Sequence, residues 1–202
     1  MTMVAVSRET QDRLDAYVMM LLAENRQQNL IAKSTEPDIW QRHIVDSLQL
    51  VRHALPGRWV DIGSGAGLPG LVAAIARPEE ETVLIEPRAR RVAFLTETAM
   101  RLGLTKVRVI GARAEAVPEL SASVITARAV ASLSQLFEIG ARHAGPDCLW
   151  LLSKGRSAAT ELAEARGAWQ GRFELIPSET DVEASIVMAR DVVKAGRAGR
   201  GR

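Results

Sequence analysis

The segment from Trp59 to Gly70 constrains this chain most, because it joins a short apolar run to a cluster of glycines. Trp59 to Ile62 predicts a buried strand, and Gly63 opens a span that holds four glycines with small or apolar residues between them. Glycine lets a ligand lie against bare backbone, whose N–H groups can face it. Pro69 suits the first turn of a following helix. The segment therefore predicts a strand, a glycine turn and a helix, which together form a site for a nucleotide-type cofactor.

The rest of the chain continues this alternation of strands and helices. Apolar runs predict strands at 59–62, 82–86, 107–110, 122–127 and 148–153. Helical patterns lie between or after them, at 69–76, 88–102, 132–144 and 157–169. Two last strand-like runs, 172–177 and 184–193, have no helix between them and predict an antiparallel hairpin. We therefore expect an α/β fold with a mostly parallel seven-stranded sheet covered on both faces.

Two amphipathic helices precede the first strand. Apolar residues from Leu14 to Leu22 follow helical spacing, and a second helix is expected from Asp38 to Leu55. We expect an N-terminal helical extension at 1–57, one α/β domain at 58–194 and a disordered basic tail at 195–202.

Composition limits the class of protein. The single cysteine, Cys148, lies in an apolar run and is expected to be a buried thiol in a reducing compartment. No signal peptide is evident, and the apolar runs are shorter than the ~20 residues that span a bilayer. We expect a soluble cytoplasmic protein without membrane association.

The charge balance favours a local rather than a global affinity for nucleic acid. The net charge is +2, from 26 basic and 24 acidic residues. Five of the basic residues and one acid lie at 190–202, so the rest of the chain is slightly acidic. Any affinity for nucleic acid must therefore come from a local patch together with this tail.

The glycine turn by itself is compatible with more than one cofactor. A P-loop is excluded, because no Gly-Lys-Ser/Thr sequence follows. The dinucleotide fingerprint is present as Gly65, Gly67 and Gly70, and Glu86 is placed as its ribose-binding acid would be. An NAD site is therefore one alternative.

Three features favour S-adenosylmethionine over NAD. Asp61 lies inside the strand before the turn, where a carboxylate can orient the loop and face the ammonium group of the ligand. Helices come before the first strand, and too little chain follows the sheet for a separate substrate domain. The expected antiparallel hairpin is common in methyltransferases and unusual in dehydrogenases.

Several short motifs occur in one order and at compatible spacing: Asn29-Leu30, Arg42-His43-x-x-Asp46-Ser47, Asp61 to Gly70, Glu86-x-x-x-Arg90-Arg91-x-x-Phe94-Leu95, Arg113-Ala-Glu115, Arg128-Ala-x-Ala131 and Lys154-Gly155. On these motifs the chain resembles the RsmG (GidB) family from about Asn29 to about Lys194. The resemblance implies a Rossmann-like class I S-adenosylmethionine-dependent methyltransferase that methylates guanine N7 in small-subunit (16S) ribosomal RNA. Two positions depart from the family, Pro87 where Ser is frequent and Ile31 where Thr is common.

On this resemblance, residues at the ends of four strands are expected to form the cofactor site. Glu86 should accept hydrogen bonds from the ribose hydroxyls, because a carboxylate accepts two donors well. The backbone of the turn should contact the methionine end, and the resemblance places Ala114 and Glu115 beside the adenine. Arg128 ends a strand and could bind cofactor, target base or phosphate. The expected cofactor residues are Asp61, Gly63, Gly65, Gly67, Leu68, Glu86, Ala114, Glu115 and Arg128.

Residues for binding RNA and positioning the target are less sharply defined. Arg88, Arg90 and Arg91 open a helix, where positive charge opposes the macrodipole, so an RNA phosphate partner would account for them. Lys154 ends the fifth strand and is a candidate for RNA binding. Together with Arg128 and His43, it is also a candidate for positioning the target base. His43 and Asp46 lie three residues apart and could pair. The histidines show no metal-ligand spacing, so no metal is expected.

The expected chemistry needs no acid–base pair, because guanine N7 carries a free lone pair and no proton. Alignment of the reacting atoms can supply ~7–11 kcal/mol. The expected substrate is 16S RNA, either in the small ribosomal subunit or in an assembly intermediate, and the protein is expected to be a monomer. Two rivals remain, an NAD-dependent oxidoreductase and a non-catalytic RNA-binding protein of ribosome assembly. Tyr17, the only tyrosine, lies in the N-terminal helix, so the usual Tyr–Lys pair of the first rival is missing.

Overall fold

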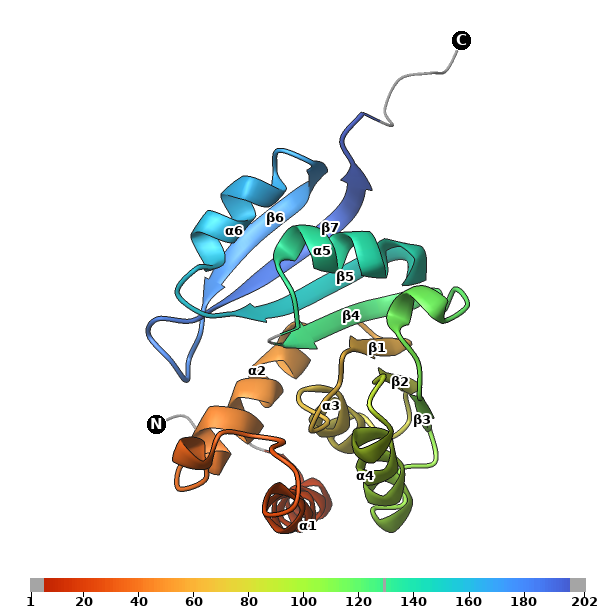
Figure 1. Cartoon of the computed structure of the whole chain (residues 1–202), viewed down its shortest axis with the longest axis vertical. Helices are drawn as coiled ribbons and strands as arrows, with labels where there is room; N and C mark the ends of the chain where they lie inside the picture. Colours follow the sequence, from red (N-terminus) through yellow and green to blue (C-terminus); the bar gives the residue numbers. More distant parts are fainter. Residues whose placement is uncertain (1–5, 129, 197–202) are drawn as a thin grey trace.

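In the computed structural model, which describes residues 6–128 and 130–196, a seven-stranded sheet forms the centre of the molecule (Figure 1). The strand order is β3-β2-β1-β4-β5-β7-β6. The first five strands pair in parallel, and β7 pairs antiparallel with both β5 and β6. The strands are β1 Trp59–Ile62, β2 Thr82–Ile85, β3 Val107–Ile110, β4 Ala122–Arg128, β5 Ala144–Lys154, β6 Trp169–Pro177 and β7 Ser185–Lys194. The expected parallel sheet and antiparallel hairpin are both confirmed.

Helices cover both faces of this sheet because the buried strands carry apolar side chains on both sides. Val60 and Ile62 of β1 point to one face and pack with α5 and α6, while Trp59 points to the other face with α2 and α3. The α-helices are α1 Arg8–Asn25, α2 Asp46–His53, α3 Gly70–Ala76, α4 Ala89–Arg101, α5 Leu133–Gly140 and α6 Ala158–Ala165. Short helical turns occupy Lys33–Thr35, Trp40–Val45, Ala114–Ala116 and Ala141–His143.

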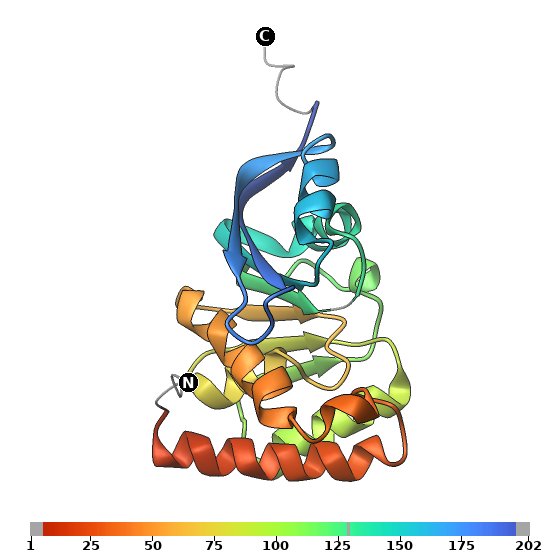
Figure 2. The same cartoon turned by 90° about the vertical axis from the view of Figure 1, so that its left-hand side faces the viewer.

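The amino-terminal helices belong to the same core as the sheet. Leu14, Tyr17 and Leu21 of α1 are fully buried and pack in one cluster with Leu71 and Ile75 of α3. Figure 2 shows α1 lying lengthwise across the end of the molecule that carries α3 and α4. The extension therefore covers the helix that follows the glycine turn.

The structure corrects several expected boundaries. The expected helix at 157–169 is shorter, because Trp169 already begins β6, where its ring is buried against Phe137. The expected helix at 132–144 ends at Gly140, and β5 is longer than the expected 148–153. The expected helix from Asp38 to Leu55 is a π-helical turn followed by α2. Of the expected tail, Ala195 and Gly196 form a turn, and 197–202 lie outside the described residues.

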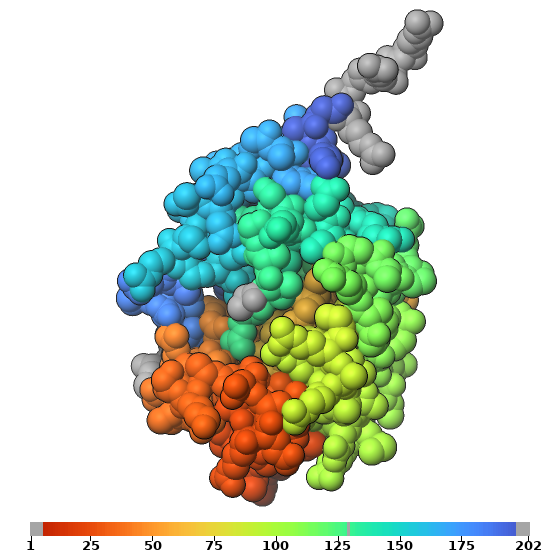
Figure 3. Space-filling view, viewed as in Figure 1, coloured from red at the N-terminus to blue at the C-terminus, as the bar shows by residue number. Residues whose placement is uncertain are grey.

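The strand order reverses between β1 and β4, and this reversal positions the site. In open α/β sheets, ligands bind past the carboxyl ends of the strands at such a reversal. The glycine turn follows β1 there, and Arg128 ends β4 beside it. Figure 3 shows the surface hollowed between the orange amino-terminal helices and the green-to-blue half of the molecule.

Candidate functional site

The glycine turn after β1 is bound tightly to the rest of the sheet. The amides of Gly63 and Ser64 both donate to the carbonyl of Ile85 at the end of β2, at 2.8 and 3.0 Å. Gly63 and Gly65 have φ angles of +69° and +57°, which L side chains rarely adopt. A Cβ added to Gly63 would lie 2.7 Å from Val130, whereas one added to Gly65 would meet nothing closer than 3.7 Å. The turn thus presents bare backbone that requires glycine and borders open space.

Glu86 connects this turn to the next loop. The residue is 2% exposed, with one carboxylate oxygen accepting from the Gly65 amide and the other from the Arg88 amide, both at 2.9 Å. The guanidinium of Arg91 lies 3.9 Å from the same carboxylate. A carboxylate offers about four acceptor positions, so Glu86 can hold the turn and still accept further donors.

A cavity of about 390 Å³ lies over the turn, between the ends of β1, β2 and β4. Five of the expected cofactor residues line it: Gly63, Gly65, Leu68, Glu86 and Arg128. Arg88 and Arg91, expected to bind RNA, line it as well. In the described part of the chain, Asp61, Gly67, Ala114 and Glu115 are not among its lining residues.

Asp61 lies beneath the turn. It is 1% exposed, and its Oδ1 accepts from the Thr126 hydroxyl at 2.7 Å, which in turn accepts from the Trp59 indole N–H. No described group forms a hydrogen bond of normal geometry with Oδ2. Burial raises the pKa of Asp61 to about 6, against the opposing effect of the Thr126 and Ser64 hydrogen bonds and of the Gly70 amide. This carboxylate supports the turn from below.

Ala114 and Glu115 form a short helical turn after β3. The carbonyl of Ala114 is held by His143 at 3.0 Å, and the carbonyl of Glu115 accepts from Arg142 at 2.6 Å. The side chain of Ala114 is buried and that of Glu115 is exposed. Their carbonyls are therefore engaged with the protein, which leaves backbone N–H groups for a ligand at this strand end.

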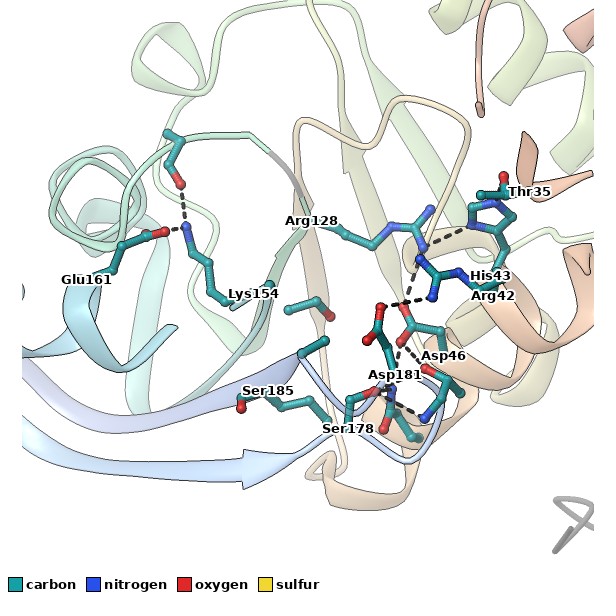
Figure 4. Close-up of a pocket in the computed structure, with 17 residues that line it drawn as sticks. Thr35, Arg42, His43, Asp46, Arg128, Lys154, Glu161, Ser178, Asp181 and Ser185 are labelled. Carbon is teal, nitrogen blue, oxygen red and sulfur yellow. Dashed lines mark hydrogen bonds and ion pairs between the residues drawn. The ribbon is translucent and has the colours of Figure 1, made fainter. Parts of the chain in front are cut away.

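A second cleft of about 410 Å³ opens on the other side of Arg128 (Figure 4). Arg128 lines both cavities. One of its guanidinium nitrogens lies 3.2 Å from Nδ1 of His43 and 3.4 Å from a carboxylate oxygen of Asp46. Residues of three motifs that are far apart in sequence thus meet around one cleft: His43 with Asp46, Arg128, and Lys154.

The hydrogen bonds of His43 fix its tautomer. The Thr35 hydroxyl donates to the carbonyl of Ala32 at 2.7 Å, so it accepts from Nε2 of His43, 2.8 Å away. Nε2 therefore carries the proton, and Nδ1 accepts from Arg128. Burial, together with the positive charge of Arg128 and Arg42, lowers the pKa of His43 to about 4. The ring is neutral at neutral pH and orients Arg128.

Lys154 is held on the opposite wall of the cleft. Its ammonium group donates to the carbonyl of Ala131 and lies 2.8 Å from the Glu161 carboxylate. Lys154 and neighbouring hydrogen bonds outweigh the effect of burial, so the pKa of Glu161 lies below its ordinary value. Lys154 thus presents a compensated positive charge at the end of β5.

The structure adds cleft residues that the sequence analysis missed. The loop between β6 and β7 bonds to the amino-terminal helices: Thr180 donates to Asp46 at 2.7 Å, and Asp181 pairs with Arg42 at 2.8 Å. Ser153 also lines the cleft, and its buried hydroxyl has no hydrogen-bond partner among the described residues. These are ordinary polar residues without distinctive spacing, so only the fold could identify them.

In residues 6–128 and 130–196, no three His, Cys, Asp or Glu side chains gather as metal ligands would. The helices of this same part include none with the length and hydropathy to cross a bilayer.

Sequence comparisons find strong similarity along nearly the whole chain. The model of the family described as rRNA small subunit methyltransferase G (GidB) matches residues 10–179. A protein of Rhizorhabdus wittichii named ribosomal RNA small subunit methyltransferase G is 46% identical over 98% of this chain and 93% of its own length. A protein of the same name from Zymomonas mobilis is 42% identical over 94% of this chain and 89% of its own length.

Structural comparisons agree on the fold. A SAM-dependent methyltransferase from Aquifex aeolicus superposes with a TM-score of 0.61 and 15% identity, covering 78% of this chain and 95% of that one. A methyltransferase from Geobacter sulfurreducens gives a TM-score of 0.60 at 15% identity and covers 94% of this chain and 99% of that one. TYW2 of M. jannaschii, solved in complex with AdoMet, gives 0.57 at 13% identity, covering 75% of each chain. At these identities the likeness concerns the fold.

Proposed function

The chain belongs to the rRNA small subunit methyltransferase G family and is an S-adenosylmethionine-dependent rRNA methyltransferase, and we propose that it methylates N7 of a guanine in 16S RNA with the two cavities that meet at Arg128. The cavity over the glycine turn holds the cofactor, and the cleft lined by Asp46 and Lys154 receives the target guanine. Neither an NAD-dependent oxidoreductase nor a non-catalytic RNA-binding protein is favoured by these relatives.

One observation carries this proposal: Arg128 lines both cavities, so the two ligands would meet beside its guanidinium. The cofactor cavity suits S-adenosylmethionine, because Gly65 borders open space on the bare turn and buried Glu86 points acceptor oxygens toward it. We place the methionine end of the cofactor on Gly63, Gly65, Gly67 and Leu68 and the ribose on Glu86, with Asp61 supporting the turn. The adenine lies toward the backbone of Ala114 and Glu115.

S-adenosylmethionine supplies a methyl group already activated on a sulfonium sulfur. The N7 lone pair of guanine forms the new N–C bond as the S–C bond breaks, so no proton has to be removed. The chain then has to align the two ligands, and alignment can supply ~7–11 kcal/mol. Arg128, oriented by neutral His43 and by Asp46, positions the guanine from one side, and Lys154 does so from the other.

We propose that residues 58–194 form the methyltransferase domain and residues 1–57 its helical extension, followed by a basic tail from 195. The substrate is 16S RNA in the small ribosomal subunit or in an assembly intermediate, and the enzyme acts as a cytoplasmic monomer without membrane association.

Equilibrium binding of S-adenosylhomocysteine tests the cofactor site. A hydrogen bond to a charged group is worth ~1.5–3 kcal/mol, so Glu86→Gln should weaken binding by roughly 10- to 150-fold. Glu164→Gln on the exposed face of α6 is the matched control and should leave the affinity unchanged. Binding of NADH without S-adenosylhomocysteine would support the oxidoreductase, and binding of RNA alone would support the non-catalytic protein.

A further inference from the structure

A groove of about 590 Å³ lies beside the cofactor cavity and is strongly basic. One wall is the segment that follows α1, and the other is the start of α4. Among the described residues, five cationic side chains and no acidic one line it: Arg26, Lys33, Arg88, Arg90 and Arg91. Figure 3 shows the orange and yellow-green surfaces of these two walls adjoining. We refer to these five residues and the intervening space as the basic groove.

Most cations of the basic groove lack an acidic partner. Arg91 lies 3.9 Å from Glu86. Among the described residues, Arg26, Lys33, Arg88 and Arg90 form no ion pair, although twelve ion pairs occur in that part of the chain, that of Arg91 with Glu86 included. Each of the four is exposed. Unpaired like charges gathered on one surface repel one another, so the groove favours an anionic partner.

The two walls are fastened together, so the groove is a built feature. The guanidinium of Arg90 donates to the carbonyl of Gln27 at 3.1 Å, and the side-chain amide of Gln28 donates to the carbonyl of Arg90 at 3.2 Å. Two further amide side chains, those of Gln27 and Asn29, line the same space. Amides of this kind can bond to sugar hydroxyls and base edges, which a small inorganic anion does not offer.

The position of the groove indicates which anion it fits. It shares Arg88 and Arg91 with the cofactor cavity, which shares Arg128 with the cleft for the target guanine. These three spaces therefore form a continuous series along the carboxyl edge of the sheet. An RNA strand whose guanine enters the cleft can extend along this edge, and its phosphates then meet the unpaired cations.

We propose that the basic groove binds the phosphate backbone of the substrate RNA beside the target guanine, and that Arg26 and Lys33 are part of this interface. The inference rests on the proposed function and extends the RNA interface from the arginines of α4 to the segment after α1. Arg91 has a smaller role in it, because Glu86 already compensates its charge.

Salt dependence gives the expected size of the effect. Each phosphate contact to single-stranded RNA contributes ~0.7 to the slope of log affinity against log salt. Loss of two contacts in Arg26→Ala/Lys33→Ala should lower that slope by ~1.4, which corresponds to roughly 14-fold weaker binding at ~0.15 M salt. Both side chains are exposed and take no part in the core, so the variant should fold normally.

The experiment measures methyl transfer from S-adenosylmethionine to undermethylated small ribosomal subunits, and obtains KM for the subunits over a range of salt. Lys106→Ala/Arg108→Ala is the matched control, because both residues are exposed, form no ion pair among the described residues, and lie at the amino end of β3. The proposal expects a higher KM and a shallower salt slope for Arg26→Ala/Lys33→Ala alone, with kcat and the affinity for S-adenosylhomocysteine unchanged.

If the wild-type enzyme transfers methyl groups but the two double variants have equal KM values and equal salt slopes, the proposal that the basic groove binds RNA is refuted. A wild-type enzyme that transfers no methyl group to RNA would instead refute the proposed function. A loss of S-adenosylhomocysteine affinity in Arg26→Ala/Lys33→Ala would also overturn the proposal, since the groove would then act on the cofactor rather than on RNA.

Discussion

Tyr17→Phe is the substitution that tests most sharply whether the amino-terminal helix orders the cofactor turn. The Tyr17 hydroxyl is fully buried in α1 and donates at 2.9 Å to the carbonyl of Ala66, in the middle of the turn. Burial also keeps its pKa far above the ordinary value, so it stays a donor. Among the described residues, no other donor to that carbonyl is recorded.

Removal of the hydroxyl leaves the Ala66 carbonyl buried and unpaired, which costs about 1–3 kcal/mol. Where that cost falls on the conformation that binds the cofactor, the dissociation constant of S-adenosylhomocysteine should rise about 5- to 150-fold. Isothermal titration calorimetry measures this constant, and thermal unfolding measures the accompanying loss, about 2–4 °C per kcal/mol for a chain of this size.

A control separates loop order from general stability. Val187→Ala truncates a buried side chain in β7, away from the turn, and should cost a comparable free energy of unfolding, roughly 1–3 kcal/mol. Its affinity for S-adenosylhomocysteine should equal that of the wild type. If Tyr17→Phe lowers stability but binds S-adenosylhomocysteine as tightly as Val187→Ala does, the helix does not order the turn, and this reasoning is refuted.

Three further predictions concern the ionisable groups of the site. Because the pKa of Asp61 is raised to about 6 in the folded state, the folded protein binds more protons than the unfolded chain between pH 4 and 6, so this group lowers stability as the pH rises through that window. The unfolding free energy of Asp61→Asn relative to that of the wild type should therefore rise by about 2 kcal/mol between pH 4 and 7. A pH-independent difference would argue against a buried charge. His43 has its pKa lowered to about 4, so the unfolded chain binds more protons between that value and 6.5, and its contribution to stability rises with pH across this window. The single-turnover rate of methyl transfer should then show no titration that depends on His43 between pH 6 and 8; a titration near pH 6.5 that disappears in His43→Gln would show that the ring is not held neutral. In Arg128 one guanidinium nitrogen contacts His43 and Asp46, which leaves the other N–H groups of the planar fork for a ligand, and an ammonium lacks that fork. Arg128→Lys should therefore lower kcat by roughly 10- to 100-fold, or about 1.4–2.8 kcal/mol of alignment; an unchanged kcat in rapid-quench measurements would remove Arg128 from the site.

Local patterns predict much of this fold, because each acts over a few residues. The strand from Trp59 to Ile62, the glycine turn and the final hairpin all follow from hydropathy and turn residues. The end of α6 does not, since its helical pattern continues to Trp169 while packing against Phe137 and pairing with β7 hold that residue in a strand. Tertiary burial there outweighs helical spacing.

The candidate site likewise has parts that the sequence predicts and parts that it does not. Glycines and Glu86 are recognisable because close backbone approach and a strand-end acid leave a spacing in the sequence. The contact between Tyr17 and Ala66 joins residues 49 positions apart, and that between Asp46 and Thr180 joins residues 134 apart. Neither has a local signature, so the hydrogen bonds that orient the turn and the cleft could be read only from the assembled fold.

The central claim is tested most directly by mapping the methylated atom. Purified enzyme, S-adenosylmethionine with a labelled methyl group and undermethylated small ribosomal subunits should give label in 16S RNA. Chemical strand scission specific for 7-methylguanosine should then cut that RNA at one labelled guanine, and Arg128→Lys should reduce the cut in proportion to the label. Label at an exocyclic nitrogen, a ribose hydroxyl or another base would contradict the account, as would the absence of label from the RNA.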